Sequence, residues 1–310
     1  MAVKVSVGIA VYNVQQYIEK CARSLFEQTL QEVEFVFVDD CSQDDSIKVL
    51  QKTLLEYPHR QNQVKIVSHL TNQGPMHARK SAMAEFTGEY MIFCDSDDWI
   101  EPDMLEKMYE LAEKSGADVI HCGYNIRSEN KKDKLNCEAF DISDYQTFMK
   151  MFHQADISPF LWVFLFRRRC FDWHEFYLPD SLFFAEDLLL LFQILRQCSS
   201  VACCPESYYY YNRREGSLSH SSAVRKMLNL RHVLRYIYRN CSEQYLREAL
   251  KVRIFYFILF CLRNKLFRRS QIAVYKRYFS LGDVLKCRQL GVKKRLQIFF
   301  AVTLGRLFFR

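Results

Sequence analysis

The chain has 310 residues, of which 49% are apolar and 15% aromatic, with only 9 Gly and 6 Pro. This composition excludes a collagen, a coiled coil, a disordered tail and a turn-rich all-β chain. The net charge of +7 is unevenly spread, because residues 225–310 carry +18 and residues 1–224 carry −11. We therefore expect two domains, one over 1–224 and a basic, aromatic-rich helical extension over 225–310.

The cysteines and the apolar runs bear on the compartment. The chain starts with a strand pattern rather than a secretory leader, and its 12 cysteines show no zinc-ligand spacing. Reduced thiols in a cytoplasmic protein are therefore favoured over a disulfide scaffold. The uncharged apolar run 254–262 in the basic part is too short to cross a bilayer, which needs about 20 residues.

The first 95 residues alternate between strand and helix patterns. Buried-strand patterns occupy residues 3–11, 33–38, 64–67 and 90–94. Helical spacing occupies residues 15–29, 46–57 and 75–86. Three strand–helix units and a fourth strand predict an α/β fold, with a Rossmann-like, mostly parallel sheet covered by helices. In such sheets ligands bind beyond the carboxyl ends of the strands.

Acidic residues follow two of these predicted strands. Asp39 and Asp40 follow the second strand, and Asp95, Asp97 and Asp98 follow the fourth. Three carboxylates within four residues repel one another unless a cation neutralises them, and their hard oxygens suit Mg²⁺ or Mn²⁺. The competing interpretation is an acidic turn that caps the next helix. Neither a Gly-x-Gly-x-x-Gly motif nor a phosphate-binding lysine loop is present, which disfavours dinucleotide and P-loop nucleotide binding.

Four short blocks occur in order along the chain: Val5–Asn13 with Gln28-Thr29, Val38–Asp44, Asn72–Arg79 and Asp95–Trp99. Together they resemble the family 2 glycosyltransferases of bacterial polysaccharide synthesis, which have the GT-A fold, over roughly residues 3–220. The resemblance implies an enzyme that takes a nucleoside diphosphate sugar, most simply a UDP-sugar, with divalent Mn²⁺ or Mg²⁺. It also implies transfer of the sugar to a glycan or lipid-linked glycan acceptor, with inversion of configuration.

The resemblance also assigns residues to the donor and the metal. Asp40, with Asp39 beside it, matches the carboxylate on the base, and Asp97 matches the metal ligand on the diphosphate. Asp95 matches the carboxylate near the ribose, and Arg79 matches a residue near the nucleotide. The donor-binding set is Ala10, Tyr12, Asn13, Asp39, Asp40, Arg79, Asp95, Ser96, Arg213 and Arg214. The metal set is Asp97, Asp95 and His220, and a solvated loop histidine is the competing interpretation of His220.

Two further carboxylates begin an apolar stretch that has the pattern of a helix. The resemblance gives Asp187 the role of catalytic base and Glu186 a supporting role. The competing interpretation is a pair of helix N-terminal carboxylates stabilised by the helix dipole. Arg213 and Arg214 lie in a later stretch and could clamp phosphate oxygens.

The sequence departs from the family pattern at three positions. Ala10 stands where proline is common, Cys41 where glycine is usual, and Lys80 where asparagine is frequent. If the turn at residue 41 needs a positive φ, a cysteine is costly there. These departures affect the expected shape of the base pocket more than the expected fold.

Two other interpretations of the enzyme-like part stay open at this point. A sugar-phosphate nucleotidyltransferase would share the sheet type, but it would want a Gly-rich signature near the first strand, where this chain has Tyr12-Asn13. A non-catalytic sugar-nucleotide-binding protein would not need both Asp97 and Asp187. Trp99, Trp162 and Trp173 are either sugar-stacking residues of an acceptor site or core aromatics.

The basic part has the pattern of helices on an anionic surface. Arg231, Arg235 and Arg239 recur every four residues, and the basic cluster 293–295 precedes an apolar helical face in 296–308. This combination favours binding to lipid, peripherally on the inner face of the cell membrane. Nucleic-acid binding is the rival interpretation, and we do not expect it because no recognisable module is present. The apolar run 254–262 is expected to be buried, because apolar residues surround the whole helix.

Overall fold

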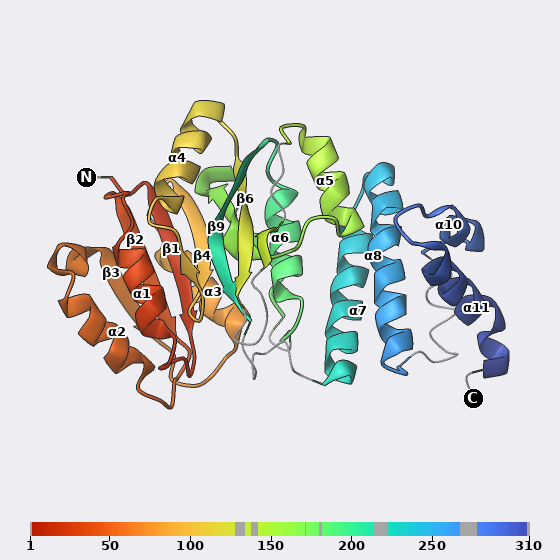
Figure 1. The fold of residues 1–310 in the computed structure, drawn as a ribbon, viewed down its shortest axis with the longest axis horizontal. Helices are drawn as coiled ribbons and strands as arrows, with labels where there is room; N and C mark the ends of the chain where they lie inside the picture. The colour runs from red at the N-terminus through yellow and green to blue at the C-terminus, as the bar shows by residue number, and fades with distance from the viewer. Residues whose placement is uncertain are drawn as a thin grey trace. The chain divides into compact units, whose positions relative to one another are not determined.

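The structure is a computed structural model that describes residues 2–127, 134–137, 142–170, 172–179, 182–213, 222–266 and 278–308. It divides into two compact units (Figure 1). The sheet unit consists of Met1–Tyr145 and Phe160–Ser217, and the helical unit consists of Gln146–Pro159 and Leu218–Arg310. The domain boundary expected at residue 224 stays a prediction.

The strands of the described residues belong to one sheet. They are β1 (Val5–Val11), β2 (Val33–Asp39), β3 (Val64–Ser68), β4 (Tyr90–Asp95), β5 (Trp99–Ile100), β6 (Val119–Arg127), β7 (Lys134–Cys137), β8 (Phe164–Arg167) and β9 (Val201–Asn212). The α-helices of the described residues are α1 (Ile18–Phe26), α2 (Ser46–Leu55), α3 (Pro75–Glu85), α4 (Met104–Ser115), α5 (Tyr145–Gln154), α6 (Glu186–Leu195), α7 (Ala223–Asn240), α8 (Gln244–Arg263), α10 (Leu281–Lys286) and α11 (Val292–Phe308).

The strand order is β3-β2-β1-β4-β8-β6-β9-β5, and β7 pairs with β6. The four strands predicted from the sequence, β1 to β4, pair in parallel, with Val5 opposite both Val33 and Tyr90. Beyond β4 the sheet is mixed: β8 is antiparallel to both β4 and β6, and β9 is parallel to β6. The predicted α/β fold with a helix-covered sheet is therefore confirmed.

This topology brings distant segments to one edge of the sheet. Because β4 and β6 are both antiparallel to β8, they run in the same direction, and β9 follows β6. The ends of β1, β2, β4 and β9 therefore meet at one edge, which we call the carboxyl edge, and β8 begins there. Asp39, Asp95 and Asn212 are the last residues of β2, β4 and β9 at this edge.

The helices of the sheet unit form where the apolar spacing predicts them. The residues of α1 that the sequence pattern singles out, Ile18, Cys21, Ala22 and Leu25, are all buried. Helix α3 begins at Pro75, directly after Gly74 with a φ of 89°, and packs on β1 and β2. Helix α6 is buried all round from Leu188 to Leu195, so its polar end, Glu186-Asp187, is held firmly at its first turn.

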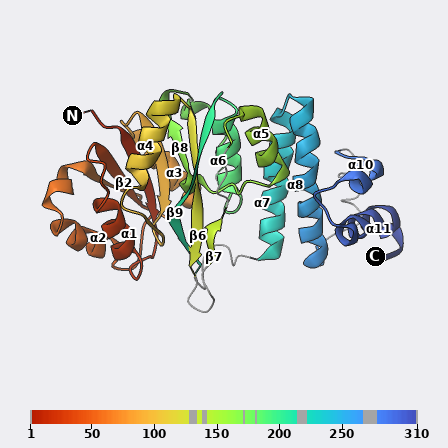
Figure 2. The same ribbon diagram turned by 45° about the horizontal axis from the view of Figure 1, so that its top comes forward.

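The helical unit contains the C-terminal helices that the sequence predicts. Helices α7 and α8 run side by side (Figure 2), and α11 packs on α8 and α10. The run 254–262 lies in α8, where most of its side chains are buried. Among the described residues no helix combines the length and the apolar character that crossing a bilayer requires. Every cysteine other than Cys137 is a free thiol in the structure.

Candidate active site

Three turns that border the carboxyl edge hold non-glycine residues in the left-handed region. Asn13 follows β1 with a φ of 52°, Cys41 follows β2 with a φ of 63°, and Ala185 precedes α6 with a φ of 63°. Cys41 therefore occupies the conformation that glycine adopts more cheaply, at a cost of about 1–2 kcal/mol. Strain of this kind persists where the surroundings hold the backbone in place, and it is common at functional sites.

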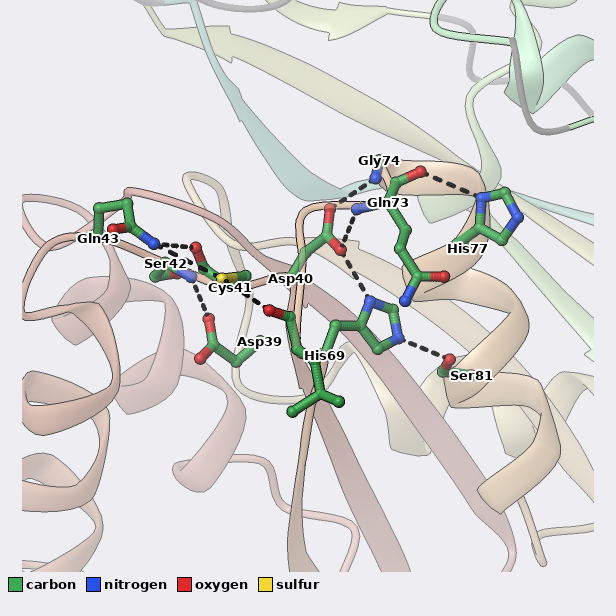
Figure 3. Close-up of polar contacts among 11 residues, drawn as sticks. Asp39, Asp40, Cys41, Ser42, Gln43, His69, Gln73, Gly74, His77 and Ser81 are labelled. Atoms are coloured by element: carbon green, nitrogen blue, oxygen red, sulfur yellow. Dashed lines mark hydrogen bonds and ion pairs between the residues drawn. The ribbon is translucent and has the colours of Figure 1, made fainter.

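The turns after β1 and β2 are hydrogen-bonded to each other. Asn13 Oδ1 accepts from the Gln43 backbone N–H at 2.8 Å, and the Asn13 N–H donates to Ser42 Oγ at 3.3 Å. The Ser42 N–H in turn donates to Asp39 Oδ1 at 2.9 Å (Figure 3). Tyr12 stands beside these turns with 44% of its surface exposed. The two turns thus form one rigid rim with an exposed aromatic ring.

Asp40 is only 3% exposed, and its carboxylate holds the segment that leads into α3. Its Oδ1 accepts from the Gln73 N–H at 2.8 Å, and its Oδ2 accepts from the Gly74 N–H at 2.7 Å. His69 Nδ1 donates to Oδ1 at 2.7 Å, and His69 Nε2 lies 2.8 Å from Ser81 Oγ on α3 (Figure 3). Both oxygens of Asp40 are therefore engaged within the protein, and the half-buried Asp39 is the more open of the two carboxylates.

Arg79 brings together three carboxylates from two elements, β4 and α6. It lies on α3, is 6% exposed, and its Nη1 is 2.8 Å from Asp187 Oδ1 and 3.4 Å from Glu186 Oε1. Its Nη2 is 3.3 Å from Asp95 Oδ1 at the end of β4. The Asp187 contact is an ion pair whose angle is too poor for a hydrogen bond. One guanidinium faces three carboxylates, so this cluster, the Arg79 cluster, carries a formal charge of −2.

Burial shifts the pKa values in the Arg79 cluster. Burial raises the pKa of Asp187 to about 8, while Arg79 opposes this and Glu186 and Asp95 add to it. Burial likewise raises the pKa of Asp95 to about 6, with Arg79 again opposing and Asp97 adding to the shift. Burial opposes the charge on Arg79, but Asp187, Asp95 and Glu186 together raise the pKa of the guanidinium. The guanidinium therefore stays charged. The mutual repulsion of the carboxylates contributes to the raised pKa values of Asp95 and Asp187.

Hydrogen bonds join the rest of the acidic turn, which is the segment of residues 95–98 after β4, to β9. Asp98 is 1% exposed, its Oδ2 accepts from Tyr209 Oη at 2.7 Å, and its Oδ1 accepts from the Asn212 N–H at 2.7 Å. The same Tyr209 oxygen accepts from the Asp95 N–H at 3.0 Å. Burial, followed by Asp97 and Asp95, raises the pKa of Asp98. Asp98 is thus a structural carboxylate, and Asp95 and Asp97, both half-buried, are the ones accessible to a ligand.

The remaining residues assigned from the sequence lie as follows. Ala10 sits on β1 between Val38 of β2 and Asp95 of β4. Ser96 is 5% exposed, within the acidic turn. Arg213 is exposed just after β9. Arg214 and His220 lie outside the described residues.

The carboxylates fit a cation that is shared with a ligand rather than one chelated by the protein alone. In the described part of the chain, no three His, Cys, Asp or Glu side chains converge as a metal-binding group. Asp95 and Asp97 nevertheless offer hard oxygen atoms beside a cluster with a formal charge of −2. Mg²⁺-type ions are commonly held by one or two carboxylates, with phosphate oxygens completing the coordination.

Sequence reasoning missed two parts of this edge. No sequence pattern identifies His69 as a partner of Asp40. No pattern identifies Tyr209 as the residue that links Asp98 to Asp95. The run of four tyrosines at 208–211 is the signal that could have drawn attention to Tyr209. Trp162, a candidate sugar platform, is 2% exposed and stacks on Tyr209 with ring centroids 4.1 Å apart. It cannot itself present a face to a ligand.

A parallel half-sheet with an acidic carboxyl edge, extended by a mixed half, is the GT-A class of fold. The chain belongs to glycosyl transferase family 2, whose family model matches residues 6–171. The uncharacterized glycosyltransferase EpsJ of Bacillus subtilis is 27% identical over 220 residues, which cover 69% of this chain and 62% of that protein. The chain thus spans less than two thirds of this relative's length.

Two solved structures share the fold. Residues 1–349 of S. aureus TarS in complex with UDP-GlcNAc match with a TM-score of 0.67 and 21% identity. This match covers 98% of this chain and 82% of that one. The mannosyltransferase PcManGT of Pyrobaculum calidifontis, in complex with GDP-Man and Mn²⁺, matches with a TM-score of 0.61 and 14% identity. This match covers 99% of this chain and 88% of that one.

Proposed function

We propose that the protein transfers a sugar from a nucleoside diphosphate sugar, most simply a UDP-sugar, to a glycan or lipid-linked glycan acceptor, with inversion of configuration. The observation that carries the proposal is the Arg79 cluster. It places a carboxylate of the acidic turn, Asp95, and a carboxylate at the start of a buried helix, Asp187, on one guanidinium. Membership of the family and the nucleotide sugars named for the two solved structures support it.

The donor's nucleoside lies against the rim formed after β1 and β2. Tyr12 offers an exposed ring on which a base can stack, and Asn13 fixes the turn beneath it. Asp39 has the freer carboxylate and accepts hydrogen bonds from the base, while Asp40 holds the adjacent segment in place. Ala10, Ser96, Arg213 and Arg214 complete the donor-binding set. Because Asp39 is more open than Asp40, we assign the contact with the base to Asp39, where the sequence motif alone favours Asp40.

The diphosphate lies at the acidic turn, where Asp97 and Asp95 would hold a divalent cation, with His220 as a further candidate ligand. Bound there, the cation would supply positive charge to offset the charge on the leaving diphosphate. The Mn²⁺ named for the PcManGT complex supports this choice of ion. Arg79 contributes by holding Asp95 in position from the adjacent helix.

Asp187 is the base that activates the acceptor. Its raised pKa of about 8 lies near working pH, which is where a general base is most effective. Its carboxylate takes the proton of the acceptor hydroxyl as the hydroxyl oxygen bonds to the anomeric carbon. The bond from that carbon to the diphosphate oxygen breaks, and its electron pair leaves with the diphosphate. Glu186 supports this step by sharing Arg79, which keeps the guanidinium oriented.

The decisive variant is Asp187→Asn. It keeps the side-chain shape and removes the base, so we expect sugar transfer to fall by about 10²–10⁴-fold. Binding of UDP in the presence of Mn²⁺, measured by calorimetry, should change little. Glu110→Gln, which amidates an exposed carboxylate on α4, is the matched control and should keep full turnover. Unchanged turnover in Asp187→Asn would refute the assignment of Asp187 as the base. If the wild-type protein binds UDP but shows no turnover, it is a binding protein and not an enzyme.

The helical unit attaches the protein to the inner face of the membrane. Leu296 and Phe300 of α11 are 41% and 50% exposed, and they follow the basic residues 293–295. Each basic residue close to an anionic surface contributes about 1 kcal/mol to binding. Exposed apolar side chains next to a basic cluster support an interfacial helix that lies on lipid.

A further inference from the structure

Four aromatic rings meet where β8 begins and β9 ends. Trp162, which precedes β8, stacks on Tyr209 with ring centroids 4.1 Å apart and an interplanar angle of 13°. It also stacks on Phe160, at 4.7 Å and 10°, and on Tyr211, at 5.8 Å and 23°. Phe160 and Tyr211 lie 6.0 Å from each other at 32°. Trp162 therefore stacks on the other three rings, whereas Phe160 and Tyr211 are tilted to each other. A fifth ring, Tyr124, packs edge-on against Phe160 and Trp162.

The stack has a buried inner part and an accessible outer part. Trp162 and Tyr209 are 2% and 0% exposed, whereas Phe160 and Tyr211 are half-buried residues. Tyr209 and Tyr211 alternate with Tyr210 along β9, so they share one face of the strand. Tyr210 points to the other face, where it stacks on Trp99. The inner pair gives the outer pair a rigid support.

The outer rings lie at the carboxyl edge, beside the acidic turn. Tyr209 donates its hydroxyl to Asp98, and the next residue of its face, Tyr211, is followed by Asn212, whose N–H also donates to Asp98. Burial raises the pKa of Tyr211, and the charges of Asp98, Asp95 and Asp97 add to this shift. Tyr211 thus directly precedes the residue whose N–H binds the acidic turn.

The strand order separates these rings from the nucleoside rim. The rim lies at the ends of β2 and β1, the acidic turn follows β4, and the rings lie on the far side of β4, at β8 and β9. Neighbouring strands are about 4.8 Å apart, so three spacings put the start of β8 about 14 Å from the end of β2. A nucleoside, its diphosphate and a second ligand fit along this edge in that order.

We propose that Phe160 and Tyr211 form a platform on which a pyranose ring of the acceptor lies, and that Trp162 and Tyr209 support it. The proposal rests on the proposed glycosyl transfer and names the acceptor's binding residues. A pyranose presents a face of C–H groups, which the negative face of an aromatic ring attracts. The polar acidic turn lies next to the platform, on the side where the hydroxyls of the pyranose project. A rigid apolar surface with a few polar groups beside it is the usual form of a small-ligand site.

The test compares leucine variants of the platform with a leucine variant on the opposite face of β9. Phe160→Leu and Tyr211→Leu keep apolar volume and remove a ring of the platform, and Tyr211→Phe keeps the ring. Tyr210→Leu is the matched control, because Tyr210 lies on the opposite face. The probes are UDP and GDP with Mn²⁺, measured by calorimetry, and the methyl β-glycosides of glucose, galactose and N-acetylglucosamine, titrated by saturation-transfer NMR against the nucleotide-loaded protein.

We expect Phe160→Leu and Tyr211→Leu to raise the Kd of the bound glycoside by about 3- to 10-fold, the effect of losing one aromatic stacking partner. Tyr211→Phe and Tyr210→Leu should bind the glycoside as the wild-type protein does, and all four variants should keep the wild-type nucleotide affinity. Thermal melts check that each variant is folded.

Three results would overturn the platform while leaving the proposed function intact. They are unchanged glycoside affinity in both platform variants, absence of any glycoside contact in the nucleotide-loaded wild-type protein, and a parallel loss of nucleotide affinity, which would place the rings under the donor. A wild-type protein that binds neither UDP nor GDP would instead refute the proposed function, and the platform with it.

Discussion

Replacing Arg79 by methionine tests the electrostatics of the site most directly. The substitution keeps a long apolar stem and removes the guanidinium, so the formal charge of the Arg79 cluster changes from −2 to −3. Removing one partner of a buried ion pair costs about 3–5 kcal/mol, because an uncompensated charge is left behind. In a chain of this size, that loss lowers the Tm by on the order of 10 °C.

The loss should depend on pH in a defined direction. Asp95 and Asp187 have folded-state pKa values of about 6 and about 8, above the ordinary value of 3.8, even with Arg79 lowering them. A carboxyl whose pKa is raised on folding keeps its proton to a higher pH in the folded state than in the unfolded state. Its burial therefore destabilises the protein progressively as the pH rises from the unfolded pKa of 3.8 through the folded pKa. At pH 5 these two groups are mostly protonated and the missing cation costs little. The penalty grows as the pH rises to 8.5, because loss of Arg79 raises both pKa values further and ionisation becomes harder in the variant.

The assay is a series of thermal melts of wild-type and Arg79→Met protein between pH 5 and pH 8.5. The matched control is Arg60→Met, since Arg60 is also buried but donates to the backbone carbonyls of Phe26, Gln28 and Leu30 rather than to carboxylates. We expect the Tm deficit of Arg79→Met to widen with pH and that of Arg60→Met to stay constant. Equal deficits at both pH limits for Arg79→Met would show that Arg79 acts through packing, and the charge argument would be wrong.

Three further predictions concern the metal, the strained turn and the basic helix. Asp97→Asn should abolish the increase in UDP affinity that Mn²⁺ produces, and calorimetry that shows an undiminished Mn²⁺ effect would contradict the metal assignment. Cys41→Gly should raise the free energy of unfolding by about 0.5–1 kcal/mol in urea melts, because relief of the left-handed strain exceeds the extra chain entropy of glycine; a loss of stability would show that the thiol contacts matter more. Deletion of residues 293–310 should move the protein from vesicles that contain phosphatidylserine to the supernatant in a sedimentation assay, and an unchanged distribution would refute the lipid contact.

The parts of the fold that the sequence predicted are those with strong local patterns. Strands β1, β2 and β4 are parallel and mostly buried, so branched and aromatic apolar residues dominate them. Strand β3, at the end of the strand order, is short and less buried, but its alternating valines and isoleucine still indicate a strand. The mixed half of the sheet lacks such a signal. Strand β8 has four residues, and β9 carries Pro205 and the exposed Glu206 in its middle, where its register against β6 shifts. Strands β8 and β9 form because they pair with segments far away in the sequence. The local periodicity of the sequence carries no information about such pairing.

The same distinction between local patterns and long-range contacts applies to the candidate site. The clustering of carboxylates at Asp95–Asp98 and Glu186-Asp187 is visible in the sequence, because it lies in short blocks. That Arg79 joins the two blocks is not visible, because the contact with Glu186 spans 107 positions along the chain. The burial of Trp162 was equally out of reach, since a tryptophan beside a predicted site is as consistent with a sugar platform as with a core residue.

The hydrogen bonds of Tyr209 set a lower limit on how far this chain can be shortened. The segment that matches the family model ends at residue 171, before α6 and β9 begin. A protein cut there would keep Arg79 and Asp98 but lose Asp187, Tyr209 and the Asn212 N–H that hold them. Asp98 would remain buried without its donors, in a sheet whose β6 has lost a neighbour. The region that matches the family model is therefore smaller than the region that keeps the Arg79 cluster and the Asp98 hydrogen bonds, and a shortened gene would have to extend through residue 212.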